Sequence, residues 1–151
     1  MLNPDFKEFC TSLINNEVRF LVVGEYALAA HGRPRYTDDF NVWVEPTAEN
    51  AARVLAALDD FGFGGLGLTL GDLTAPDMVI QLGYPLARID LLTQPEGVHF
   101  ETCYLNRTTL DFDDVLLPFI GVRDLIQNKR ASARPQDLAD VAALETLEDP
   151  S

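Results

Sequence analysis

The chain has 151 residues, 47% of them hydrophobic, which is the usual size of one globular domain with a single core. Its formal net charge is −13, so the surface repels phosphate backbones and disfavours broad nucleic-acid binding and anionic membranes. No apolar run approaches the roughly 20 residues of a membrane-spanning helix, and Cys10 and Cys103 lack metal-ligand spacing. We therefore expect a single cytoplasmic domain over residues 1–151 with two reduced thiols.

Hydrophobic periodicity predicts alternating helices and strands. Apolar residues at helical spacing predict an amphipathic helix over residues 4–16. The continuous apolar run Phe20–Val23 is typical of a strand covered on both faces, and Gly24 ends it. A short helix rich in Ala and Leu is expected over 25–31, and a second strand over 40–44.

The remaining elements complete an α/β pattern. Thr47 is expected to cap a third helix, and the glycine-rich segment 61–73 is predicted to be a flexible loop, either a lid or a plain surface loop. Two apolar stretches, 78–82 and 87–92, predict a hairpin. The last predicted elements are two short strands at 108–112 and 115–119 and two closing helices at 122–131 and 135–147.

Three polar side chains stand out on the predicted strands. Alternation along a strand places Asp39 and Asn41 on one face, and Asp90 is a lone carboxylate within another apolar strand. A carboxylate inside a core strand is costly unless something compensates it. Oxygens that converge from neighbouring strands form the hard-cation site that Mg²⁺ prefers, and the Gly24 turn adds a helix start suited to phosphate oxygens.

These motifs together resemble a known superfamily. The pattern of strand, glycine turn, short helix, His31-Gly32-x-x-Arg35-x-Thr37-x-Asp39-x-Asn41 and a later Asp90 is similar to the nucleotidyltransferases that share the polymerase β palm-like fold. Small bacterial members, including minimal nucleotidyltransferases and abortive-infection toxins, look most similar. The resemblance covers roughly residues 18–145 and implies a mixed sheet with flanking helices and two C-terminal helices.

The resemblance also implies roles for single residues. Asp39 matches the first metal carboxylate, Asn41 stands where the second belongs, and Asp90 matches the third, which helps deprotonate the attacking hydroxyl. Gly24 matches the phosphate turn, and Glu25 stands where the family has Gly or Ser. The implied reaction is Mg²⁺-dependent transfer of a nucleoside monophosphate from a nucleoside triphosphate (NTP) to an acceptor.

Two of these positions depart from the motif. Asn41 keeps the shape of Asp but brings no charge and one acceptor oxygen, so the carboxylate that bridges two metals is missing. Glu25 adds a negative charge at the helix start, where it competes with phosphates. Asp38 could supply the missing charge, but strand alternation points it to the other face. Both departures argue against ordinary two-metal catalysis.

Four further residues are candidates for nucleotide binding. Lys129 and Arg134, on the closing helices, are expected either to reach phosphates or to form structural ion pairs with nearby aspartates. Arg35 and Thr37 match the family pattern. For Arg35 the alternatives are phosphate contact and an ion pair with Asp38 or Glu25.

The sequence therefore supports two functional hypotheses. The first is a Mg²⁺-dependent nucleotidyltransferase with an NTP as donor and an unknown acceptor. The second is a catalytically degenerate binding or regulatory module with the same fold. A toxin-antitoxin component that assembles with a protein partner or as a homo-oligomer is a third interpretation, taken from the family alone.

Overall fold

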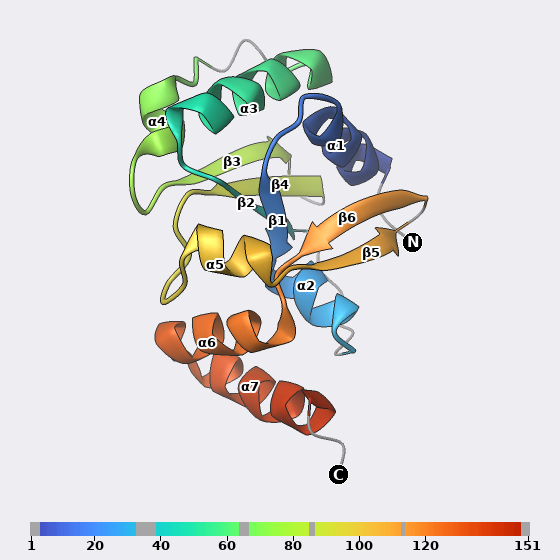
Figure 1. Cartoon of the computed structure of the whole chain (residues 1–151), viewed down its shortest axis with the longest axis vertical. Helices are drawn as coiled ribbons and strands as arrows, with labels where there is room; N and C mark the ends of the chain where they lie inside the picture. The colour runs from blue at the N-terminus through green and yellow to red at the C-terminus, as the bar shows by residue number, and fades with distance from the viewer. Residues whose placement is uncertain (1–3, 33–38, 64–66, 85–86, 113, 149–151) are drawn as a thin grey trace.

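In the part of the chain that the structure describes, six strands form one mixed sheet in the order β3-β4-β2-β1-β6-β5 (Figure 1). The computed structural model describes residues 4–32, 39–63, 67–84, 87–112 and 114–148. The central pair β1–β2 is antiparallel, the pairs β2–β4 and β1–β6 on either side of it are parallel, and the outer pairs β3–β4 and β5–β6 are antiparallel. The mixed α/β sheet is confirmed. The strands are β1 (Phe20–Val23), β2 (Asp39–Val44), β3 (Val79–Tyr84), β4 (Ala87–Leu92), β5 (Thr108–Phe112) and β6 (Val115–Phe119).

Helices lie on both sides of the sheet, with α1, α3 and α4 on one side and α5, α6 and α7 on the other in Figure 1. None of the helices within the described ranges is long and apolar enough to cross a membrane. The helices are α1 (Pro4–Asn15), α2 (Gly24–Ala30), α3 (Ala48–Phe61), α4 (Leu70–Thr74), α5 (Phe100–Leu105), α6 (Val122–Ser132) and α7 (Pro135–Glu148).

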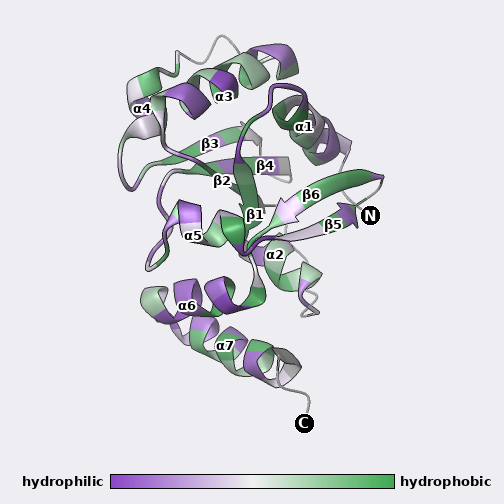
Figure 2. Ribbon diagram, viewed as in Figure 1, coloured by the Kyte–Doolittle hydropathy of each residue, from purple (hydrophilic) through white to green (hydrophobic). Residues whose placement is uncertain are grey.

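Strand alternation divides the core between the two faces of the sheet. On one face, Phe40 of β2 stacks on Phe6 of α1 with 4.9 Å between ring centroids. On the other face, Trp43 of β2 meets Phe100 of α5 edge-on and donates a hydrogen bond to the Thr93 carbonyl. Phe40 and Trp43 are fully buried. Figure 2 shows the corresponding concentration of hydrophobic residues in β1 and β6. The carboxyl end of β2 around Trp43 is fully buried, whereas its polar side chains, Asp39 and Asn41, lie in its first half and are only partly buried.

Most predicted boundaries are confirmed within one residue, including the Thr47 cap, whose hydroxyl accepts a hydrogen bond from the Asn50 amide. The prediction of a continuous loop over 61–73 was wrong in part. α4 begins there because Thr69 and Asp72 form a capping box, in which each side chain accepts a hydrogen bond from the other residue's backbone amide. Leu73 is fully buried and fixes this short helix to the core.

One helix was not predicted. α5 spans only six residues and lacks a side-chain hydrogen bond at its cap, His99. Its formation depends on tertiary packing, because Phe100 and Cys103 are buried and Phe100 contacts Trp43. This helix covers the sheet face that also carries the polar residues described next.

Candidate active site

A polar cluster lies where β2 and β4 run side by side, and we define it as Asp39, Asn41, Arg88 and Asp90. In the parallel register Asp39 faces Arg88 and Asn41 faces Asp90. All four side chains therefore leave the same face of the sheet. The predicted pairing of Asp39 with Asn41 on one face is correct, and the register adds Asp90 directly beside Asn41.

Two oxygens of the cluster have unusual surroundings. Asn41 Oδ1 and Asp90 Oδ1 are buried, and neither has a hydrogen-bond partner among the described residues. Burial raises the pKa of the Asp90 carboxyl above its usual value and the charge of Asp39 raises it further, while Arg88 opposes the shift. Buried acceptors without partners are costly. Two of them on neighbouring positions of one face fit the oxygen ligands of a hard cation.

The cluster fits one divalent cation better than two. It holds two carboxylates, and one of them already contacts a guanidinium: Arg88 Nε lies 3.2 Å from Asp39 Oδ1. Both side chains of this pair are exposed, 43% for Arg88 and 42% for Asp39. Among the described residues, no group of three or more His, Cys, Asp or Glu side chains is arranged to hold a metal. The amide of Asn41 thus leaves the cluster short of the charge that two bound metal ions require.

The Gly24 turn approaches the cluster closely. Gly24 begins α2 with φ +70°, and a Cβ atom there would lie 2.4 Å from Asn41 Nδ2. Its neighbour Val23 pairs with Asn41 in the β1–β2 register. Glycine is required at this point both by the left-handed backbone and by the contact with the Asn41 amide.

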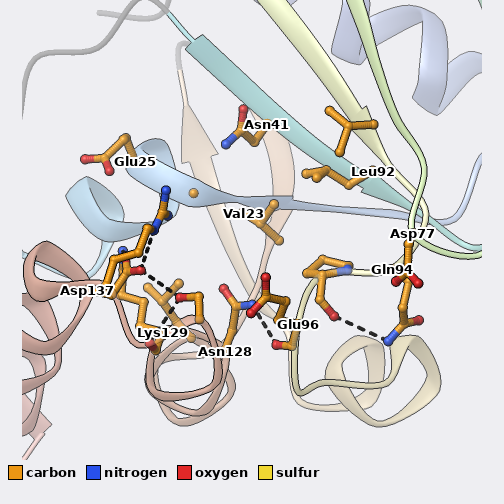
Figure 3. Close-up of a pocket in the computed structure, with 16 residues that line it drawn as sticks. Val23, Glu25, Asn41, Asp77, Leu92, Gln94, Glu96, Asn128, Lys129 and Asp137 are labelled. Atoms are coloured by element: carbon orange, nitrogen blue, oxygen red, sulfur yellow. Dashed lines mark hydrogen bonds and ion pairs between the residues drawn. The ribbon is translucent and has the colours of Figure 1, made fainter.

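Glu25 stands at the start of α2, beside the same turn. Its carboxylate points away from Asn41 in Figure 3 and lines the wall of a cleft. Asp137, and at longer range Glu96 and Glu25, raise the pKa of the Arg134 guanidinium. Glu25 and Arg134 therefore both line the cleft, and the charge of Glu25 acts on the Arg134 guanidinium.

The cleft has a volume of about 420 Å³ and lies between the sheet and the closing helices (Figure 3). Asn41 belongs both to the polar cluster and to the cleft lining, whereas Asp39 and Asp90 lie outside that lining. The wall is more acidic than basic. Its charged residues are Glu25, Asp77, Glu96, Asp137, Lys129 and Arg134.

Both predicted cations of the closing helices form ion pairs. Lys129 Nζ lies 3.1 Å from Asp140 Oδ2 and 3.5 Å from Asp137 Oδ1, and all three residues are buried. Arg134 Nε donates to Asp137 Oδ2 at 2.8 Å, and Ser132 donates to the same oxygen at 2.7 Å. Lys129 is thus held by carboxylates, while Arg134 is 77% exposed at the cleft.

The burial of Asp137 is compensated by these partners. Burial raises its pKa, but the hydrogen bonds from Arg134 and Ser132 and the charge of Lys129 outweigh that effect and lower the pKa to about 2. The carboxylate is therefore ionised at neutral pH and joins α6 to α7.

Five of the predicted site residues line the cleft, namely Gly24, Glu25, Asn41, Lys129 and Arg134. Asp39 and Asp90 lie outside the lining and are connected to it through Asn41, which shares their face of the sheet and lies beside Asp90 in the β2–β4 register. Arg35, Thr37 and the alternative carboxylate Asp38 lie outside the described residues. Their predicted roles stay predictions.

Three residues of the polar cluster and the cleft were not predicted from the sequence: Arg88, Asp77 and Glu96. Arg88 precedes Asp90 by two positions, so the alternation that placed Asp90 also places Arg88 on the same face; that signal was present. Asp77 and Glu96 line the cleft from loops before β3 and after β4. No periodic pattern marks such loop residues.

The chain is similar in structure to two solved proteins. The lincosamide antibiotic adenylyltransferase LnuA, in its lincomycin-bound crystal structure, superposes with a TM-score of 0.56 at 10% identity, over 97% of this chain and 98% of that one. A candidate nucleotidyltransferase from Thermotoga maritima gives 0.53 at 11% identity, over 98% and 93%. No family model matches the sequence, and no curated protein matches it significantly. The whole described chain therefore has the nucleotidyltransferase fold that its strand and turn motifs predicted.

Proposed function

We propose that this protein is a Mg²⁺-dependent nucleotidyltransferase that moves a nucleoside monophosphate from an NTP to an acceptor hydroxyl. The observation that carries the proposal is the pair of buried oxygens, Asn41 Oδ1 and Asp90 Oδ1, which have no hydrogen-bond partner among the described residues. Asn41 lines a cleft of about 420 Å³, and Asp90 lies beside Asn41 in the strand register, in a chain with the nucleotidyltransferase fold. A cation at these oxygens would satisfy both of them.

The residues would divide the work as follows. Asp39, Asn41 and Asp90 would hold one Mg²⁺, which would neutralise phosphate charge and stabilise the leaving pyrophosphate. The Asp90 carboxylate, whose pKa is raised first by burial and then by Asp39, would accept the proton of the attacking hydroxyl. Arg134 is exposed at the cleft wall and would contact phosphate oxygens through the guanidinium nitrogens that do not bond Asp137.

The cleft imposes a condition on this reaction. Its acidic residues outnumber its basic ones, and Lys129 is already bound to two carboxylates. A free triphosphate is therefore repelled, and binding is expected to need the divalent cation. Glu25 adds to this repulsion from the Gly24 turn.

A second candidate function follows from Glu25 and Asn41. A protein with one weak cation site and an acidic phosphate turn would bind ligands in the cleft without transferring a nucleotide. If the protein is such a degenerate binding or regulatory module, it should bind nucleotide in the presence of a divalent cation but should not transfer the nucleoside monophosphate to an acceptor. Association with a protein partner or as a homo-oligomer, as part of a toxin-antitoxin pair, and residence in the cytoplasm are compatible with either function.

The test is incubation with α-³²P-labelled NTPs and Mg²⁺ or Mn²⁺ in the presence of cell-extract RNA, protein and small-molecule fractions. We expect transfer of label that Asp39→Asn abolishes. Asp59→Asn, which removes the same charge from the exposed end of α3, is the matched control and should retain activity. Absence of transfer with the wild type, together with Mn²⁺-dependent binding of ATP, would favour the degenerate module.

The double variant Glu25→Ser with Asn41→Asp restores the residues that the motif expects. Under either function it should bind NTP more tightly than the wild type. Glu25→Ser removes a negative charge that repels phosphates at the Gly24 turn, and Asn41→Asp adds a negative charge that attracts the cation. Unchanged NTP binding by a folded double variant would contradict the assignment of the site itself.

A further inference from the structure

The guanidinium of Arg88, which stays positively charged at ordinary pH, contacts a carboxylate of the proposed cation site. Arg88 lies on β4, two residues before Asp90 and in register with Asp39 of β2. Its Nε lies 3.2 Å from Asp39 Oδ1. The guanidinium and a divalent cation would therefore use the same carboxylate.

The charge of the polar cluster supports competition at this position. Asp39 and Asp90 contribute two negative charges, Asn41 contributes none, and Arg88 contributes one positive charge that it cannot lose at ordinary pH. The net charge of the cluster is therefore −1. Each bound divalent cation must overcome repulsion from Arg88 or displace it from Asp39.

The contact between Arg88 and Asp39 is of a kind that can be displaced. Both side chains are exposed, 43% and 42%, so solvent screens their attraction, and exposed pairs of this type are weak. The buried oxygens Asn41 Oδ1 and Asp90 Oδ1 lie next along the same two strands and have no hydrogen-bond partner among the described residues. Displacement of Arg88 would leave its side chain on the site face, where its planar donors suit a phosphate oxygen.

We propose that Arg88 controls cation occupancy of this site: it competes with divalent metal for Asp39, so that the protein without nucleotide binds one divalent cation weakly. The inference rests on the cation site of the proposed function and goes beyond it, since it makes Arg88 the residue that sets metal affinity and stoichiometry. It concerns metal binding alone and does not require that nucleotide transfer takes place.

The test is a titration of the full-length protein with Mn²⁺, with free Mn²⁺ followed by electron paramagnetic resonance in the absence of nucleotide. The wild type should bind one Mn²⁺. Arg88→Gln should bind it roughly fivefold more tightly, because the attraction between the unit charges of Arg88 and Asp39, about 4 Å apart in bulk water, corresponds to roughly a fivefold change in affinity. Arg53→Gln is the matched control, since Arg53 forms an exposed ion pair with Glu49 on α3, and it should leave the Mn²⁺ affinity unchanged.

A double-mutant cycle separates competition at Asp39 from a general effect of charge. In an Asp39→Asn background the carboxylate for which the two cations compete is gone, so Arg88→Gln should change the Mn²⁺ affinity by less than about twofold. An equal gain in both backgrounds, or no gain in Arg88→Gln, would overturn the proposal. The folding of each variant is checked by urea unfolding, in which loss of this exposed ion pair should have little effect.

The outcomes also separate this proposal from the proposed function. Tighter Mn²⁺ binding by Arg88→Gln with no nucleotide transfer by any variant would support the role of Arg88 and refute transfer. Absence of Mn²⁺ binding by the wild type and by Arg88→Gln would refute both, because no cation site would then exist at Asp90 and Asn41.

Discussion

Replacement of Lys129 by Met tests the buried network that joins the closing helices. Lys129 is 6% exposed, and its ammonium lies 3.1 Å from Asp140 and 3.5 Å from Asp137, which are themselves 0% and 3% exposed. Met has nearly the same length, so it removes the charge without opening a large cavity. Removing one partner from a buried charge network typically costs about 3 to 5 kcal/mol, because the remaining charges lose part of their compensation.

The expected cost can be read directly from urea unfolding. With a slope of about 2 kcal/mol per molar urea, the midpoint of Lys129→Met should fall by roughly 1.5 to 2.5 M at pH 7. The matched control is Lys7→Met on α1, which removes the other lysine of the chain and should change stability by about 0.5 kcal/mol. Circular dichroism of both variants follows the loss of helix.

A double variant shows whether the loss comes from the ion pair itself. If Lys129 compensates Asp140, then Lys129→Met with Asp140→Leu should be more stable than the sum of the single changes predicts, by about 1 to 3 kcal/mol. A loss below about 1 kcal/mol in the single variant, or strict additivity in the double variant, would show that Lys129 does not compensate the buried charge of Asp140. The network would then contribute little to the stability of the closing helices.

Three further measurements test other parts of the structure. Because its partners lower the pKa of Asp137 from its usual value to about 2, the ionised carboxylate contributes about 2 kcal/mol to the free energy of unfolding. This contribution is present above about pH 4 and is lost as the pH falls through about 2, so Asp137→Asn should remove this pH dependence from urea unfolding between pH 5 and pH 2.5. Gly24→Ala should lower the melting temperature by about 4 to 8 °C, because φ is +70° and the new Cβ would lie 2.4 Å from Asn41 Nδ2. Gly67→Ala is the control: its φ is similar, +74°, but its Cβ would meet open space, so its melting temperature should fall clearly less. Burial raises the pKa of Cys10, and it raises that of Cys103 to about 12, so neither thiol should react with a disulfide reagent at pH 8 until the protein is unfolded; rapid reaction of the native protein would contradict the packing of α1 or α5.

The fold could largely be predicted because its signals are local. The apolar run of β1 ends at Gly24, Thr47 caps α3, and each has its cause within a few residues. α4 carried such a signal as well, since Thr69 and Asp72 have the spacing of a capping box, but the surrounding glycines masked it. α5 gave no local signal, because it depends on the contact of Phe100 with Trp43 across 57 positions in the sequence.

Local signals also predicted part of the candidate site, while the rest of it depends on tertiary structure. Strand alternation placed Asp39 and Asn41 on one face, because that rule needs only a single strand. The pairing of Asp39 with Arg88, and of Asn41 with Asp90, depends on the register of β2 against β4, which no local pattern specifies. The ion pairs of Lys129 depend in the same way on tertiary structure, because the meeting of α6 and α7 brings Asp137 and Asp140 to its ammonium.

We propose that the polar cluster of β2 and β4 is a cation site that serves the neighbouring cleft. A crystal structure with Mn²⁺ and a non-hydrolysable ATP analogue tests it most directly, because the anomalous signal of manganese locates the metal without reference to activity. We expect one peak within coordination distance of Asn41 Oδ1 and Asp90 Oδ1, with the phosphates of the analogue in the cleft. Bound nucleotide with the manganese elsewhere, or neither ligand near these oxygens at saturating concentrations, would contradict the account.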